Sequence, residues 1–126
     1  MRALLVVLGV LCTPVWAAGS WVGSAGGVRI VMADRYTTSA PITAPANLQQ
    51  GMVTSVRWQF QASPDKPLRG WLCHAEGCVV LNSGRGITER LAGIAADTAF
   101  HFRFALMPEQ RQALQVQGLQ VIVNYQ

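Results

Sequence analysis

The clearest pattern along the chain is a two-residue alternation of apolar and polar side chains. In the segment 52–61, Val56 and Trp58 alternate with polar neighbours, and the segment 100–106 repeats the alternation with three phenylalanines. Successive side chains of a β-strand point to opposite faces of a sheet, so this period predicts half-buried strands. The segment 119–125 is so apolar that we expect a third strand there, paired inside a sheet.

Further strands are predicted around a tight turn in the middle of the chain. Residues 68–73 and 78–81 flank the tetrapeptide 74–77, a spacing that predicts a β-hairpin with a four-residue loop. An earlier strand is predicted over 28–33. The prolines and the aspartate within 63–67 predict a turn before the hairpin.

The remaining segments lack a clear period. Residues 19–27 are rich in glycine, so we expect an irregular lead-in with Trp21 docked as an anchor. Residues 37–50 contain two prolines and predict a long connection or an irregular edge. Pro108 opens the segment 108–113 and indicates one short helical turn there.

Together these elements predict an all-β fold. Six or seven short strands at intervals of roughly ten residues, without a useful segment of helical period, are typical of an antiparallel β-sandwich. We therefore expect a single β-sandwich domain over residues 18–126, with one hairpin pinned by a disulfide bond.

The first residues have the features of a signal peptide. A single cation, Arg2, precedes the apolar run 3–12, which is too short to span a bilayer because a span needs roughly 20 apolar residues. We expect residues 1–17 to be the leader, with cleavage after Ala17 or, as the alternative, after Ala18. No second run of membrane length follows in the sequence, so we expect export to the periplasm without stable membrane insertion.

Two cysteines, Cys73 and Cys78, remain once the expected leader is removed. They flank the predicted loop and face each other across the hairpin, near the reach of a disulfide, in a compartment where disulfides persist. A zinc site would use the same cysteines with His74 and His101, but no second closely spaced ligand pair is present. A redox-active dithiol normally has a two-residue spacer that opens a helix. We favour a structural disulfide and expect no metal and no cofactor.

The charge of the expected mature chain is only mildly positive. Without Arg2, nine cationic side chains stand against six acidic ones, and they are scattered along the sequence. A nucleic-acid-binding protein is expected to carry a basic stripe interleaved with aromatic residues, so we expect no nucleic-acid partner. Serine, histidine and aspartate occur as isolated residues without a Gly-x-Ser-x-Gly elbow, so we expect no enzymatic activity.

The spacing of several motifs resembles the flagellar protein FlhE family. The resemblance rests on a Cys-x4-Cys hairpin at 73–78 that continues as Val-Val-Leu, and on the ending Gln-Val-Ile-Val-Asn-Tyr at 120–125. It also covers Gly86 and Thr88, and upstream it includes Ala17-Ala18-Gly19, Trp21, Ser39-Ala40-Pro41, Gly51-Met52-Val53-Thr54 and Trp58. The chain departs from the family at 107–111, where the family has a glycine-rich turn.

This resemblance implies a periplasmic β-sandwich protein of flagellar assembly and swarming, which acts as a non-enzymatic chaperone or gatekeeper. The roles proposed for that family are to keep flagellar subunits from polymerising in the periplasm and to limit proton leakage through the export apparatus. The expected partners are therefore flagellar structural subunits or the export apparatus.

The surface that contacts the partner is a separate prediction. The family assigns no residue to partner contact, so the expectation comes from the sequence alone. An antiparallel sandwich offers a partner its edge strands or an apolar groove. We expect the edge near the Cys73–Cys78 hairpin to be the contact surface, with Trp71 as a contact residue. The alternative function is an exported carbohydrate-binding module that stacks peptidoglycan sugars on Trp21 and Trp71.

Overall fold

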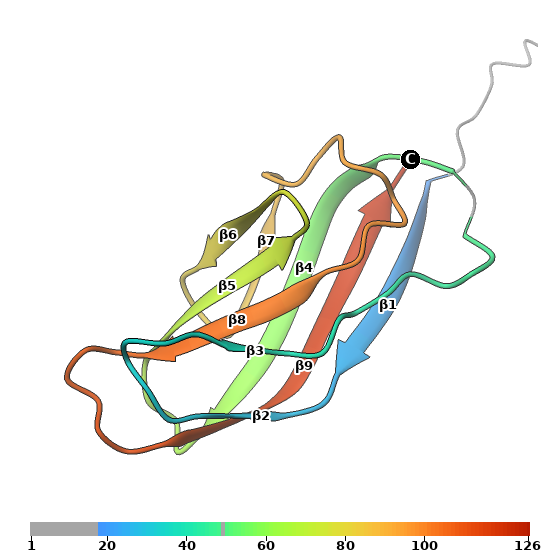
Figure 1. The fold of residues 1–126 in the computed structure, drawn as a ribbon. Coiled ribbons are helices and arrows are strands. Elements are labelled where there is room, and N and C mark those ends of the chain that lie inside the picture. Colours follow the sequence, from blue (N-terminus) through green and yellow to red (C-terminus); the bar gives the residue numbers. More distant parts are fainter. Residues whose placement is uncertain (1–17, 49) are drawn as a thin grey trace, which may run out of the picture.

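Two antiparallel β-sheets pack face to face in the computed structural model, which describes residues 18–48 and 50–126 (Figure 1). The five-stranded sheet has the order β1-β9-β4-β7, with β2 also paired to β9, and the four-stranded sheet has the order β3-β8-β5-β6. The strands are β1 (Gly19–Ala25), β2 (Val28–Ile30), β3 (Thr37–Thr38), β4 (Val53–Ser63), β5 (Leu68–His74), β6 (Gly77–Leu81), β7 (Arg85–Thr88), β8 (His101–Leu106) and β9 (Leu114–Tyr125). The predicted antiparallel β-sandwich is confirmed, with more strands than the sequence indicated.

The C-terminal strand β9 is the centre of the five-stranded sheet. It pairs with β1 and β2 along one side and with β4 along the other, so both of its backbone edges are satisfied. Leu119, Val121 and Val123 are fully buried beneath the second sheet. The prediction that this apolar segment is paired inside a sheet is confirmed, and the strand begins earlier than predicted, at Leu114.

The phenylalanines of the alternating segment 100–106 fill the space between the sheets. Phe102 and Phe104 are fully buried and their rings stack with centroids 5.7 Å apart. Phe60 reaches from β4 in the opposite sheet and meets both rings edge on, with centroid distances of 6.0 and 4.9 Å. Such aromatic contacts stabilise the core beyond the burial of apolar area alone. They hold β4 of one sheet against β8 of the other, the two strands that the alternation predicted.

The glycine-rich N-terminal segment forms a regular strand, contrary to the prediction of an irregular lead-in. β1 pairs with β9 along its whole length. Gly23 permits this because a Cβ at that position would collide with the side chain of Ile42 from the opposite sheet. The expected anchoring role of Trp21 is confirmed, since its ring is buried and its Nε1 donates a hydrogen bond to the Ala96 carbonyl at 2.8 Å.

Several segment predictions are wrong in detail. The residues 108–113 form a plain turn and not a helical turn, with the Gln110 amide donating to the Met107 carbonyl at 2.9 Å. The strand predicted over 28–33 ends at Ile30, and the chain turns away to reach the other sheet. The segment Asn-Ser-Gly-Arg-Gly at 82–86 predicts a turn, but its last two residues begin the edge strand β7. The predicted leader lies outside the described residues.

The long segment between β2 and β4 confirms the expected irregular edge. Its described residues contribute the short strand β3 to the rim of the four-stranded sheet and two isolated bridges, Ile42 with Phe100 and Met52 with Ala95. The described residues contain no helix that is long and apolar enough to cross a membrane.

Candidate functional site

The disulfide predicted between Cys73 and Cys78 is present in the β5–β6 hairpin. The two residues are directly opposed in the register, with Cα atoms 4.0 Å apart and sulfur atoms bonded at 2.06 Å. His74 pairs with Gly77, which leaves a two-residue turn instead of the predicted four-residue loop. With both sulfurs joined to each other, neither is a free thiolate for the zinc site that the sequence left as an alternative.

Trp71, the predicted contact residue, lies on the face of the sheet and not at its edge. Its strand β5 is flanked by β8 and β6, so it is an inner strand. The indole is half-buried and meets the Tyr36 ring edge on, with centroids 5.0 Å apart and planes at 80°. Trp71 therefore does not lie on the edge strand, which is β6 of the same hairpin, and partner contact by this edge and by Trp71 stays a prediction.

Side chains on the outer surface of the four-stranded sheet gather around Trp71. Trp71 is directly opposite Arg103 of β8 and Val80 of β6, so all three point to the same side of the sheet. Leu72 and Phe102 point the other way and are fully buried in the core. We call this cluster the aromatic–arginine face; its members are Tyr36, Arg69, Trp71, Val80 and Arg103.

Two guanidinium groups cover the aromatic rings of this face. The Cζ atom of Arg69 lies 6.0 Å from the Trp71 ring centroid, and that of Arg103 lies 5.3 Å from the Tyr36 centroid. Both distances lie within the range of a cation–π interaction, which is electrostatic and holds the cation over the ring. The exposed members are Tyr36, at 58% exposure, and Val80, at 63%, so the face is open to solvent.

Arg69 also ties the loop before β3 to the sheet. Its Nε donates to the Leu106 carbonyl at 3.2 Å, and its Nη2 donates to the Ala33 carbonyl. The Met32 carbonyl accepts a further hydrogen bond from the Leu106 amide at 2.9 Å. These bonds hold the loop along β8 and so position Tyr36 beside Trp71.

The electrostatic character of this sheet is basic. The sequences of β3, β5, β6 and β8 contain two arginines and two histidines and no aspartate or glutamate. Burial lowers the pKa of His101 below its ordinary value, and the neighbouring Arg103 guanidinium and His74 imidazole lower it further. His101 therefore favours the neutral imidazole, and the positive charge of the face comes from Arg69 and Arg103.

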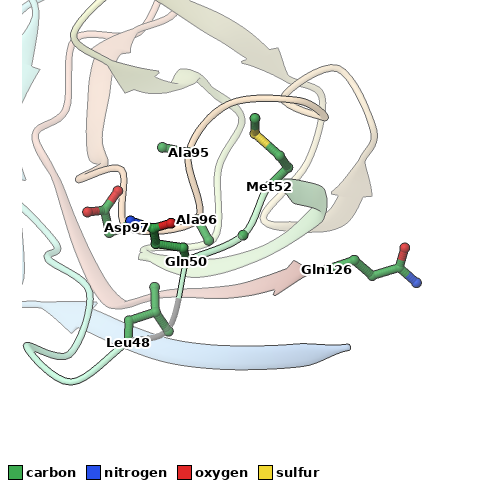
Figure 2. Close-up of a pocket in the computed structure, with 8 residues that line it drawn as sticks. Leu48, Gln50, Met52, Ala95, Ala96, Asp97 and Gln126 are labelled. Atoms are coloured by element: carbon green, nitrogen blue, oxygen red, sulfur yellow. The ribbon is translucent and has the colours of Figure 1, made fainter. Parts of the chain in front are cut away.

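A separate cavity, which shares no lining residue with the aromatic–arginine face, has a volume of about 640 Å³ (Figure 2). Its walls come from the segments before β4 and before β8 and from the C-terminal residue. Asp97 is its only ionisable side chain among the lining residues, so the cavity offers little for acid–base chemistry. The lining residues are Leu48, Gln50, Gly51, Met52, Ala95, Ala96, Asp97 and Gln126.

The sequence predictions named Trp71 but missed its neighbours on the face. The alternation in 100–106 indicates that Arg103 points outward from its strand. It does not indicate which side chains lie beside Arg103. Tyr36 lies between two short elements in a segment without a period, so no signal in the sequence placed it. The register of β3, β5 and β8 brings these residues together.

These features define a class: a small antiparallel β-sandwich with a disulfide-bonded hairpin and a basic, aromatic outer face. Comparison with known proteins gives the family. The family model described as "Flagellar protein FlhE" matches residues 27–126. The chain belongs to the FlhE family of flagellar proteins.

Individual relatives agree with this assignment. A protein described as "Flagellar protein FlhE" from Yersinia enterocolitica is 34% identical over 128 aligned positions, which cover 96% of this chain and 91% of the relative. A solved structure entitled "Crystal Structure of FLHE" superposes with a TM-score of 0.77 at 31% identity, covering 86% of this chain and 97% of that one. The resemblance stated from the sequence motifs is therefore confirmed.

Proposed function

We propose that this protein is a periplasmic accessory protein of the bacterial flagellum and acts there as a non-enzymatic chaperone or gatekeeper. It prevents flagellar subunits from assembling in the periplasm, limits proton leakage through the flagellar export apparatus, or does both, and thereby supports swarming motility. The observation that carries the proposal is the match to the FlhE family over residues 27–126.

The disulfide supports a periplasmic location. Disulfides persist in oxidising compartments such as the bacterial periplasm and are rare in the cytosol. The bond between Cys73 and Cys78 lies in a hairpin that the hydrogen-bonded ladder also supports, so it suits a structural role. The apolar run after Arg2, which lies outside the described residues, supplies the expected export signal.

A binding role is supported by the aromatic–arginine face. Tyrosine, tryptophan and arginine are the residues most often found at the centre of protein interfaces, because they combine large contact area with hydrogen-bonding groups. The face gathers all three, with tryptophan and arginine on the strands of the sheet and tyrosine on the loop that Arg69 ties to it. In this proposal Trp71 contacts the flagellar partner from the middle of the face.

The alternative, a carbohydrate-binding module, relies on two tryptophans that are not open platforms. Trp21 is buried at 4% exposure with its Nε1 bonded to Ala96. Trp71 meets Tyr36 edge on and has Arg69 over its ring. Fluorescence titration of the protein with peptidoglycan fragments and with flagellar subunits separates the two functions, and a response to the fragments alone would favour the module.

The first test of the proposal is deletion of the gene in a flagellated strain. We expect reduced swarming, restored by the full-length gene but not by a version that lacks residues 1–17 and stays in the cytosol. Filaments inside the periplasm identify the chaperone role, and cytoplasmic acidification that depends on flagellar expression identifies the gatekeeper role. Normal swarming, filament location and cytoplasmic pH in the deletion strain would refute the proposal.

A further inference from the structure

We propose that the aromatic–arginine face binds an acidic segment of a protein partner. Carboxylates of the segment pair with the guanidinium groups of Arg69 and Arg103, and its apolar side chains pack against the exposed Tyr36 and Val80. The inference rests on the proposed function only in that it takes the partner to be a protein. It adds the chemistry of the segment and the residues that recognise it.

Charge complementarity is the first argument. The four strands of this sheet contribute two arginines and no acidic side chain, and the loop that carries Tyr36 adds one cation, Arg35, and one anion, Asp34, so the net charge around the face stays positive. An arginine offers five N–H donors in a planar fork that matches the two oxygens of a carboxylate. Arg69 donates two of these to the Leu106 and Ala33 carbonyls, which leaves three for a ligand.

Preorganisation is the second argument. Arginine normally loses much side-chain freedom when it binds a ligand. Here Arg69 is fixed by two backbone carbonyls and Arg103 lies over the Tyr36 ring. Both arginine side chains are therefore partly ordered before a ligand binds. Binding of a carboxylate then loses less side-chain entropy, which favours a specific contact with these two arginines over non-specific attraction to positive charge.

The ring geometry disfavours sugars and nucleic acids as ligands. Bases stack on aromatic ring faces that are open to solvent, and stacking of a sugar has the same requirement. The Tyr36 and Trp71 rings meet edge on at 80°, and each carries a guanidinium over one face. Nucleic-acid binding also depends on neutralising many phosphates, whereas this face presents two arginines.

A second copy of the chain is also disfavoured. A symmetric dimer built on this face would place the same patch of both subunits in contact. Arg69 and Arg103 of one subunit would then lie close to the same two arginines of the other subunit. The strands β5 and β8 that carry them supply no acidic side chain to separate the charges. Like charges in a closing interface repel each other, so the occupant is expected to be a partner of opposite charge.

A binding assay with a defined probe tests the inference. The probe is a short fluorescein-labelled peptide in which glutamate alternates with leucine, and the protein is the oxidised form purified from the periplasm. We expect fluorescence anisotropy to show saturable binding that weakens as salt rises, because exposed charges are screened. The matched peptide with glutamine in place of glutamate should bind at least about tenfold more weakly.

Substitutions on the two sheets provide the controls. Arg103→Gln should weaken binding of the glutamate peptide by about tenfold or more, because it removes a charged donor. Arg103→Lys should lie in between, since the charge stays while the planar fork is lost. Arg57→Gln removes an exposed strand arginine from the other sheet and should leave binding unchanged. Circular dichroism of each variant confirms that the fold is retained.

Three results would overturn the inference. They are equal binding of the glutamate peptide by wild type and a folded Arg103→Gln variant, equal binding of the glutamine peptide, and stronger binding of a single-stranded oligonucleotide or of vesicles containing anionic lipid. The first two remove the role of charge, and the third assigns the face to another class of partner.

Complementation separates this inference from the proposed function. If the deletion strain shows a flagellar defect that Arg103→Gln repairs as fully as wild type, the inference fails and the flagellar function stands. If the deletion strain shows no flagellar defect but the purified protein binds the glutamate peptide through Arg103, the flagellar function fails and the acidic-segment site stands.

Discussion

Removal of the disulfide should lower the free energy of unfolding by about 2 kcal/mol. The bond closes a small ring, with a sequence separation of 5 between Cys73 and Cys78. In the chain-entropy account, a ring of that size restricts the unfolded chain by about 2 kcal/mol at room temperature. The suitable variant replaces both cysteines with alanine, because Cys73 is buried and a serine hydroxyl there would add the cost of burying a polar group.

Urea unfolding followed by tryptophan fluorescence measures this effect. The double alanine variant and the reduced wild type should unfold together, at a midpoint about 1 M below that of the oxidised protein, because small proteins lose about 1–3 kcal/mol of stability per molar urea. The reduced wild type is the control for changes caused by the substitutions themselves.

Two outcomes would refute this reasoning about the disulfide. An unchanged midpoint would mean that the β5–β6 ladder fixes the hairpin in the unfolded ensemble as well, so that the ring adds no restriction. A loss above about 4 kcal/mol would exceed the entropy of so small a ring and would mean that the bond holds native packing in place.

Two further predictions concern stability. Gly86→Ala should cost about 1–3 kcal/mol, because its Cβ would meet the Trp58 ring in a filled site; thermal unfolding measures this loss, and Gly77→Ala, where no atom lies within 4 Å, is the control. Burial and Arg103 lower the folded-state pKa of His101 from 6.5, so the unfolded chain binds the proton more tightly and stability should fall as the pH drops below that value. Urea midpoints measured at about pH 7.5 and 5 should show a smaller fall for His101→Gln, and equal falls would contradict the prediction.

The strands that the sequence predicted well are those with one buried and one open face. Val56 and Trp58 of β4 are buried while Arg57 between them is exposed, so the alternation reports the pleat directly. The same holds for Phe102 and Phe104 of β8. Period alone is informative there because each strand lies against the opposite sheet on one side only.

The strands that the sequence missed depend on contacts with distant segments. Gly23 reads as a breaker, yet the structure needs it because Ile42 lies where a side chain would be. Pro108 is well suited to a first helical position. The chain nevertheless needs only a turn at 108–113 before it enters β9 at Leu114, where pairing to β2 and β4 satisfies the backbone. Long-range pairing outweighs local preference in both places.

Only one residue of the candidate site was predicted from the sequence, because the site also depends on contacts between distant segments. Trp71 was recognised by its position two residues before Cys73. Its partners Tyr36 and Arg103 are brought to it by the order of strands β3, β8 and β5, which the sequence pattern does not reveal. The arginines therefore look scattered along the chain although two of them lie on one face.

The two arginines of that face have different roles: Arg69 supports the structure of the face, and Arg103 is available to contact a ligand. Arg69 donates hydrogen bonds to the Leu106 and Ala33 carbonyls and so holds the loop that carries Tyr36. Replacement of Arg69 would therefore disturb that loop. Arg103 lies over Tyr36 from the neighbouring strand and acts on whatever approaches from solvent. A loss of binding on replacement of Arg69 is therefore ambiguous between structure and recognition. Replacement of Arg103 is the perturbation that isolates recognition, because the sheet and the tethered loop stay in place.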